Sequence, residues 1–302
     1  MSKIGIVINP ISGKRGGARE GEVRAELARR FMSDRRIEGD VVLTTAAGDG
    51  KRLAASFVER GFDRVVAWGG DGTVNEVAGP LRGTRTSLGI VPSGSGDGLA
   101  RSLGLSRVTE AALATALDRP AGAIDVGRLG GRHFLNIAGV GFDAAIARVF
   151  NARRRRGGLG YLTGVFSEVW AYRCQPYQVA LGEHASSAER FLIAFANGRE
   201  YGNGIIVAPD ADPSDGWLDA IVVSSGSAWR QIWRARRVAW GRRRPAEGLL
   251  RLRVKHGTVT AEALSCHVDG ETFDARGSVE VSIDPGAIRV AGVRTAEGPG
   301  SR

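Results

Sequence analysis

The chain has 302 residues, of which 43% are hydrophobic, so it can bury the cores of two ordinary domains, which excludes a disordered or fibrous protein. Two cysteines, Cys174 and Cys266, are too few for a disulfide scaffold or a zinc site, and no apolar run approaches the ~18 residues of a membrane-spanning helix. The net charge of +10 suits nucleic acid, an anionic membrane surface or a phosphorylated substrate, without choosing among them.

Short apolar strands alternate with helix-like segments up to Pro120. The predicted strands are Ile4–Ile8, Asp40–Leu43, Arg64–Trp68 and Ser87–Val91, and the predicted helices are Arg15–Phe31, Gly50–Arg60 and Val74–Leu81. This alternation is typical of an α/β domain with a mostly parallel sheet.

Beyond Pro120 the pattern changes to closely spaced strands, which predicts a β-rich second domain. Two helical interruptions are expected at Gly157–Tyr172 and Ser227–Gly241. We expect a first domain at 1–124, a second at 125–290 and a C-terminal tail at 291–302, of which Thr295–Arg302 should be frayed. The expected strands are Ala123–Arg128, Arg132–Ala138, Tyr177–Leu181, Arg190–Asn197, Leu218–Val223, Leu249–Val254 and Val279–Ile283.

Three glycine-rich loops follow strands of the first domain: Asn9–Gly13, Gly69–Thr73 and Pro92–Gly96. Ligands of α/β sheets bind beyond the carboxyl ends of the strands, where glycine lets backbone N–H groups approach a phosphate. One such loop alone is better explained as a tight turn in which Asp71 caps a helix, but three at one edge favour a nucleotide site. None ends in the Gly-Lys-Ser/Thr of a Walker A loop, and the first strand lacks Gly-x-Gly-x-x-Gly.

Several motifs, in this order along nearly the whole chain, together resemble the diacylglycerol kinase catalytic-domain family, which includes sphingosine and ceramide kinases and bacterial lipid kinases. The Gly-Gly-Asp-Gly-Thr element alone also occurs in NAD kinases and some phosphofructokinases, whereas Asn-Pro-x-Ser-Gly with a closing Asp-Gly-Glu is more specific. The motifs are Asn9–Gly13, Gly69–Val77, Gly89–Gly96, Asp125–Gly127, Phe134–Asp143, Ser214–Asp219 and Val268–Glu271.

The resemblance implies an α/β nucleotide-binding domain followed by a β-sandwich that takes the lipid substrate, with ATP and Mg²⁺ as cofactors. It places Thr44 near the adenine and assigns the triphosphate and its magnesium chiefly to the Gly-Gly-Asp-Gly-Thr loop. The implied nucleotide-binding residues are Asn9, Ser12, Gly13, Thr44, Gly70, Asp71, Gly72, Thr73, Asn75, Ser93, Gly94 and Ser95.

The resemblance also implies the residues around the acceptor. Asp143 corresponds to the position that recognises the lipid head group, and Asp269, with Glu271 as its partner, to the proposed general base. A second, structural magnesium ion would be held by the Asp215 carboxylate and by the main-chain carbonyls of Asp212 and Trp217.

Two positions depart from the family pattern. Ser95 stands where threonine is usual and keeps the hydroxyl, whereas Asp97 replaces an asparagine and adds negative charge near the phosphates. We therefore expect Asp97 to weaken nucleotide binding or to change the metal arrangement.

The proton acceptor stays open at this point, because Asp71, Asp269 and Glu271 can each bind metal or act as base. Without the other motifs, Asp269-Gly270-Glu271 is better explained as an acidic β-turn. The four histidines show no metal-ligand spacing. His267 would share a strand face with Asp269, but the expectation is an ordinary surface histidine.

Two basic segments are relevant to membrane binding. Arg153–Arg156 favours contact with a membrane, whereas Ser227–Gly241, which mixes tryptophan with arginine as interfacial helices do, is better explained as a helix that packs its tryptophans on the β-sandwich. We expect a cytoplasmic lipid kinase that rests peripherally on the inner face of the membrane, binds no nucleic acid and has an oligomeric state that the sequence leaves open. The alternatives are an NAD-kinase-like enzyme with a soluble substrate and, because of Asp97, a catalytically weak nucleotide or lipid sensor.

Overall fold

The computed structural model describes residues 2–13, 16–145, 147–148, 172–202, 204–227, 230 and 247–293. The chain forms two compact units, one of Met1–Asp125 with Pro285–Arg302 and one of Val126–Asp284. The division after Asp125 lies one residue from the expected boundary. The end of the chain differs from the expectation, because residues 285–290 belong with the first unit: Val290 pairs in parallel with Leu88, and the Gly292 N–H bonds to the Pro120 carbonyl (2.9 Å).

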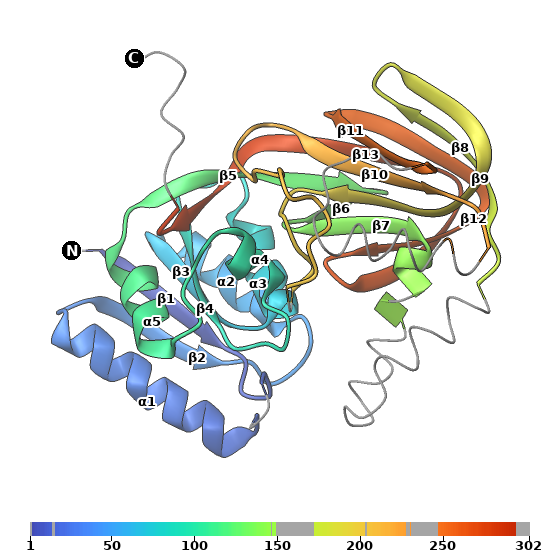
Figure 1. Cartoon of the computed structure of the whole chain (residues 1–302). Helices are drawn as coiled ribbons and strands as arrows, with labels where there is room; N and C mark the ends of the chain where they lie inside the picture. Colours follow the sequence, from blue (N-terminus) through green and yellow to red (C-terminus); the bar gives the residue numbers. More distant parts are fainter. Residues whose placement is uncertain are drawn as a thin grey trace, which may run out of the picture. The chain divides into compact units, whose positions relative to one another are not determined.

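The first unit alternates strands and helices in the order expected from its sequence (Figure 1). Two helices, Gly98–Ser102 and Thr109–Asp118, had not been expected; the first spans only five residues and contains both glycine and arginine. The elements are β1 (Lys3–Ile8), α1 (Ala18–Asp34), β2 (Glu38–Leu43), α2 (Asp49–Glu59), β3 (Arg64–Gly69), α3 (Asp71–Leu81), β4 (Ser87–Pro92), α4 (Gly98–Ser102) and α5 (Thr109–Asp118).

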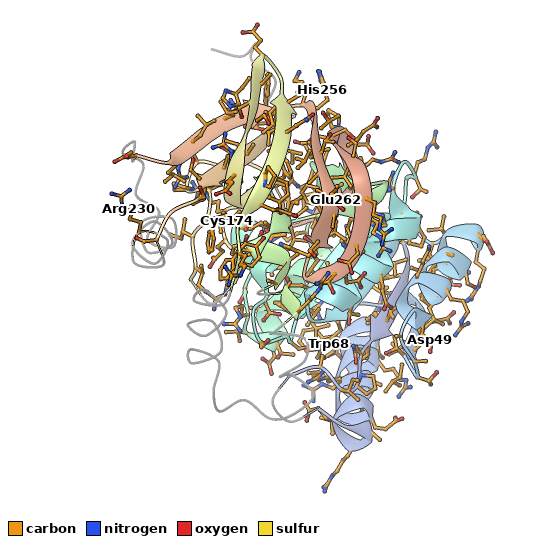
Figure 2. All side chains as sticks on the ribbon, turned by 90° about the vertical axis from the view of Figure 1, so that its right-hand side faces the viewer. Asp49, Trp68, Cys174, Arg230, His256 and Glu262 are labelled. Carbon is orange, nitrogen blue, oxygen red and sulfur yellow. The ribbon has the colours of Figure 1, made fainter. Side chains whose placement is uncertain are left out.

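The first four strands of the chain lie in the order β2-β1-β3-β4, and each neighbouring pair is parallel. Helices α1 and α5 cover one face of the strands, while α2 and α3 cover the other (Figure 1). Trp68 of β3, labelled in Figure 2, is buried in the core between the strands and helices α1 and α5. Because the strands are parallel, the loops that follow β1, β3 and β4 leave the same edge of the sheet.

The second unit is antiparallel. Its strands lie in the order β11-β10-β9-β7-β12-β13, β8 pairs with β9 and β12, and β5 pairs with β6. The strands are β5 (Ala121–Leu129), β6 (Arg132–Phe134), β7 (Ile137–Gly141), β8 (Gln175–Leu181), β9 (His184–Ala196), β10 (Leu218–Ser224), β11 (Leu249–Val254), β12 (His256–Val268) and β13 (Glu271–Ala291), of which β5 and β13 begin or end in the first unit.

One buried cluster collects apolar side chains from all these strands, including the fully buried Phe134 and Phe195, and it forms the core of the second unit. Strand β12 had not been expected, because it mixes threonine, alanine and glutamate where a strand usually alternates apolar and polar residues. The expected strand at 132–138 is split into β6 and β7 at Leu135 and Asn136.

Several expectations concern residues outside the described part of the chain. They are the helix at Gly157–Tyr172, the helix at Ser227–Gly241, the basic run Arg153–Arg156 and the tail at 295–302. Among the residues that the structure does describe, no helix combines the length and apolar character needed to cross a membrane.

Candidate functional site: the glycine loops and the Asp143 cluster

The three glycine-rich loops come together at the carboxyl edge of the first unit's sheet, because β1, β3 and β4 are neighbours in it. Asn9 begins the first loop, and its side-chain Nδ2 donates to the Thr73 hydroxyl of the second loop (2.9 Å). The Ser12 and Ser93 hydroxyls, from the first and third loops, lie 2.8 Å apart. The residues that sequence analysis assigned to the nucleotide from separate motifs are therefore brought together.

Arg24 of α1 holds two of these loops, although nothing in the sequence singled it out. Its guanidinium donates to the Ser12 hydroxyl (2.8 Å), the Ser12 carbonyl (3.0 Å), the Asn9 carbonyl (3.2 Å) and the Ser93 hydroxyl (3.4 Å). Arg24 is buried, and the carboxylate paired with it in the structure is that of the half-buried Glu20, at 3.3 Å. The guanidinium therefore fixes the loops and also brings positive charge to the edge where the nucleotide phosphates are expected.

Gly70 and Gly94 set the spacing of the second and third loops. A Cβ on Gly94 would lie 2.7 Å from the Gly70 Cα and 2.8 Å from the Asp97 carboxylate, and a Cβ on Gly70 would lie 3.2 Å from the Gly94 Cα. Only glycine allows the two backbones to approach this closely. Ser95, near the tip of the third loop, is exposed, as are Gly13 and Gly72 in the other two loops.

Asp71 is the first residue of α3, and its Oδ1 accepts the Leu99 N–H (3.3 Å), so it joins the second loop to α4. Asn75 lies one turn further along the helix and is partly buried. Glu76, within the same motif, has a structural task that sequence analysis missed. Its two carboxylate oxygens accept the N–H groups of Gly48 and Gly50 (3.0 Å each), at the N-terminus of α2.

Thr44 follows β2, and its N–H bonds to the Ile8 carbonyl (2.9 Å), so the turn after β2 begins beside the end of β1. Asp49 fixes the rest of this turn, because its Oδ2 accepts the Thr45 hydroxyl, the Thr45 N–H and the Ala46 N–H. The Thr45 side chain, its backbone N–H and Arg52 hold the pKa of the Asp49 carboxyl well below its usual range. The placement of adenine near Thr44 stays a prediction.

Both carboxylate oxygens of Asp97 have partners within the first unit. Its Oδ1 accepts the Gly94 N–H (2.8 Å), and its Oδ2 pairs with the Arg107 guanidinium (3.1 Å). Asp97 is buried and has a φ of 49°, a left-handed conformation that aspartate and asparagine tolerate better than most residues. The negative charge expected to disturb phosphate binding is therefore paired within the first unit.

In the second unit, Asp269 and Gly270 form the two-residue turn between β12 and β13, with φ angles of 46° and 86°. Asp-Gly in this left-handed geometry is the usual sequence of a type I′ hairpin turn. The Asp269 carboxylate accepts three backbone N–H groups, those of Leu135 (2.7 Å), Asn136 (3.0 Å) and Ile137 (3.0 Å). A carboxylate has about four acceptor positions. The predicted general base is thus largely occupied in fixing the start of β7, while Glu271 is exposed.

Asp143 and His267 correct a sequence-based expectation. His267 had been taken for a surface histidine, but it is only 3% exposed, and its Nε2 lies 2.8 Å from the Asp143 carboxylate. The Tyr201 hydroxyl donates to the other oxygen of Asp143. The three residues are distant in the sequence, so no local pattern could have joined them.

The predicted structural magnesium site has a different arrangement in this chain. One Asp215 oxygen accepts the Trp217 N–H (3.0 Å), and the other pairs with the Arg253 guanidinium. Arg253 and Lys255 also lie over the Trp217 ring, at 5.2 and 4.6 Å from its centroid. Asp212 accepts the N–H and the hydroxyl of Ser214 through one oxygen. A guanidinium therefore lies beside the carboxylate that was expected to hold the cation, and the structural magnesium site stays a prediction.

Burial raises the pKa of the Asp215 carboxyl, and the positive charge of Arg253 opposes that rise. Among the described residues, no cluster of three or more histidine, cysteine or acidic side chains has a metal-binding arrangement.

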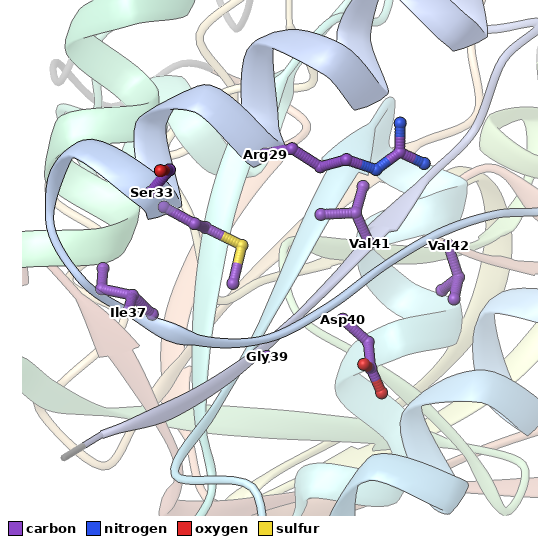
Figure 3. A pocket seen from close by; sticks show the side chains of 8 residues that line it. Arg29, Ser33, Ile37, Gly39, Asp40, Val41 and Val42 are labelled. Carbon is purple, nitrogen blue, oxygen red and sulfur yellow. The ribbon is translucent and has the colours of Figure 1, made fainter.

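A separate pocket lies between α1 and β2 (Figure 3). Its lining includes Arg29, Ser33, Ile37, Gly39 and Asp40. Gly39 and Asp40 belong to the amino-terminal half of β2, whereas the glycine loops follow the carboxyl ends of the strands. The pocket is therefore not part of the glycine-loop site.

Comparison with known proteins agrees with this geometry. Residues 3–129 match the model of the diacylglycerol kinase catalytic domain, and residues 136–292 match the model of the YegS C-terminal NAD kinase beta sandwich-like domain. Two solved structures from Bacillus anthracis, described as a diacylglycerol kinase and a putative diacylglycerol kinase, superpose with TM-scores of 0.75 and 0.77 over 96% of this chain and 96% and 97% of theirs. Their identities of 19% and 21% support the fold alone.

Relatives with more similar sequences carry related names. A probable lipid kinase YegS-like protein of Chromohalobacter salexigens is 40% identical over 64% of each chain. A protein of the same description from Pseudomonas aeruginosa is 32% identical over 94% of this chain and 93% of its own. A diacylglycerol kinase of Mycobacterium tuberculosis is 29% identical over 96% of this chain and 95% of its own.

The chain therefore belongs to the diacylglycerol kinase catalytic-domain family, with a YegS-type β-sandwich-like C-terminal domain, and it is a kinase. The resemblance and the two-domain organisation that the motifs predicted are confirmed. The family implies ATP as the phosphoryl donor.

The first prediction concerns Asp97. Asp97→Asn keeps an oxygen for the Gly94 N–H and loses the pair between a buried carboxylate and Arg107, so we expect the free energy of unfolding to fall by about 1.5 to 3 kcal/mol. The affinity for ATP should stay close to that of the wild type. Asp97→Ala removes the acceptor as well and should weaken ATP binding. Calorimetric titration of both variants tests this, and a large gain of ATP affinity in Asp97→Asn would instead show that the charge opposes phosphate.

The second prediction concerns Arg253. Without nucleotide, the melting temperature of the wild type should be the same in EDTA and in Mg²⁺, because the Arg253 guanidinium already pairs with the Asp215 carboxylate. Arg253→Met keeps an unbranched side chain over Trp217 but exposes Asp215 to a cation, so Mg²⁺ should raise the melting temperature of this variant. Asp215→Asn is the control that should not respond. A wild-type melting temperature that falls in EDTA and recovers with Mg²⁺ would contradict this account.

Proposed function

We propose that the protein transfers the γ-phosphate of ATP to the hydroxyl group of a membrane lipid, of the diacylglycerol or sphingoid type. The proposal rests on the three glycine loops, which come together at one edge of the sheet. The Arg24 guanidinium donates hydrogen bonds to two of these loops, at the Ser12 and Ser93 hydroxyls. That arrangement suits a triphosphate, because backbone N–H groups and a positive charge are gathered where anions bind in α/β sheets.

The nucleotide would lie against the loops of Asn9, Gly70 and Gly94, with its phosphates beside the N-terminus of α3. Asp71 would hold Mg²⁺ there, since magnesium in kinase sites is bound by one or two carboxylates together with phosphate oxygens. Phosphoryl transfer depends mainly on positioning and on neutralising charge, which is what this set of groups supplies.

The acceptor hydroxyl would be bound by Asp143, in line with the family resemblance. Asp269 would serve the scaffold of the second unit through its three backbone hydrogen bonds and would also accept the hydroxyl proton. The lipid assignment is supported by relatives described as probable lipid kinases and as a diacylglycerol kinase. A lipid substrate also requires the enzyme to work at a membrane surface, and the net charge of +10 favours an anionic one.

The alternative of a nucleotide sensor rested on Asp97. Its charge is paired with Arg107 and its second oxygen holds the Gly94 N–H, so this residue gives no reason to expect a defective nucleotide site. The alternative of an NAD-kinase-like enzyme would phosphorylate a soluble acceptor, and an assay of label transfer into lipids distinguishes the two.

Transfer of radiolabelled γ-phosphate into lipids in mixed micelles, with Mg²⁺, tests the proposal. The lipids should include diacylglycerol, ceramide, sphingosine and phosphatidylglycerol. We expect label in one of them and loss of label with Asp71→Asn, which keeps the oxygen that accepts the Leu99 N–H but removes the negative charge. Label in a lipid would also name the substrate class.

Two outcomes would count against the proposal. Absence of label in every lipid, although the protein binds ATP, would reject a lipid acceptor of these classes. Undiminished transfer by Asp71→Asn would leave the lipid kinase activity standing but would reject the assignment of magnesium binding to Asp71.

A further inference from the structure

The Asp143 carboxylate is buried with two side-chain donors, one on each oxygen. His267 at the end of β12 contacts Oδ2 at 2.8 Å, and Tyr201, from the loop that follows β9, donates its hydroxyl to Oδ1. His267 and Asp143 are 3% and 6% exposed. A buried carboxylate is costly unless its oxygens are hydrogen-bonded, so two fixed donors on one aspartate indicate that its orientation matters.

The hydrogen bond at the second ring nitrogen of His267, Nδ1, indicates which tautomer the imidazole adopts. The Gly270 N–H points at Nδ1, at 3.4 Å, so Nδ1 acts as the acceptor. Nε2 must then carry the hydrogen and donate it to Asp143. Because Gly270 belongs to the turn that Asp269 pins to residues 135–137, the imidazole is held by the same turn that fixes the start of β7.

Gly139 provides the space for this contact. It lies opposite His267 in the β7–β12 pair, and a Cβ at Gly139 would be only 2.0 Å from the Asp143 Oδ2. The carboxylate thus folds back over the strand, into the space that a side chain at this position would fill. Any residue other than glycine would displace Asp143 from His267.

The Tyr201 hydroxyl remains protonated near neutral pH and so keeps donating its hydrogen bond to Asp143. Burial of the hydroxyl and the adjacent Asp143 carboxylate raise the pKa of Tyr201 well above its ordinary value, so the phenol keeps its proton. Two donors occupy about half of the acceptor positions of a carboxylate, and the remaining lone pairs can accept a hydrogen bond from a ligand.

We propose that His267 and Tyr201 are positioning residues that hold the Asp143 carboxylate in one orientation for the acceptor hydroxyl of the substrate. His267 and Tyr201 act through Asp143 and do not touch the substrate themselves. The inference rests on the proposed function, since it takes the lipid hydroxyl as the group that Asp143 binds.

The test compares the initial rates of lipid phosphorylation by His267→Leu, His267→Gln and Tyr201→Phe with those of the wild type. His267→Leu removes the donor at similar volume, and kcat/KM for the lipid should fall about ten- to a hundredfold, the effect of one hydrogen bond to a charged group. KM for ATP should stay unchanged. His267→Gln restores an N–H near the position of Nε2 and should recover part of the loss. Tyr201→Phe should show a similar selective loss.

A double-substitution cycle separates positioning from a general loss of structure. Once Asp143→Asn has removed the charge, His267→Leu should cause little further loss in kcat/KM, because His267 acts through Asp143. Multiplicative losses in the double variant, or losses that follow the melting temperature of each variant, would overturn the inference. So would wild-type kinetics in His267→Leu. If the wild type labels no lipid, the proposed function itself fails, and this inference fails with it.

Discussion

The close approach of Gly70 and Gly94 is the constraint on which the first unit's site depends. A Cβ on Gly94 would lie only 2.7 Å from the Gly70 Cα, so the two backbone segments can come this near only because Gly94 has no side chain, and the contact fixes the distance between the loops after β3 and β4. Arg24 then joins the loop after β1 to the same assembly through Ser12 and Ser93. Together these contacts order the three loops before the ligand binds. The free energy of triphosphate binding is then not reduced by the entropic cost of ordering the loops.

In the second unit, a carboxylate fixes the backbone, as the two glycines do in the first unit. Asp269 collects three backbone N–H groups at the point where β6 ends and β7 begins, and it does so from a tight Asp-Gly turn. The same turn presents its Gly270 N–H to His267, which contacts Asp143. Asp269, which the family resemblance marks as the general base, thus belongs to a turn that also supports the neighbouring Asp143 carboxylate.

The sequence predicted the elements that depend on local pattern and not those that depend on distant pairing. The glycine loops were predictable because glycine after an apolar strand has few other uses at a sheet edge. Arg24 and His267 were not, since their partners lie at sequence separations of up to 69 and 124 residues and neither belongs to a recognisable motif. Arg253, whose partner Asp215 lies 38 residues away, was missed for the same reason. Arg107 lies only 10 residues from its partner Asp97 and was missed because no motif links the two.

Titration of the protein with ATP in the presence of Mg²⁺, by calorimetry, tests the central claim that the three loops form one ordered triphosphate site. Gly94→Ala should abolish binding or weaken it about tenfold or more, because the added Cβ forces the two loops apart. Gly17→Ala is the matched control: a Cβ there meets no atom within 4 Å, so binding should equal that of the wild type. Wild-type affinity in a folded Gly94→Ala protein would contradict the account.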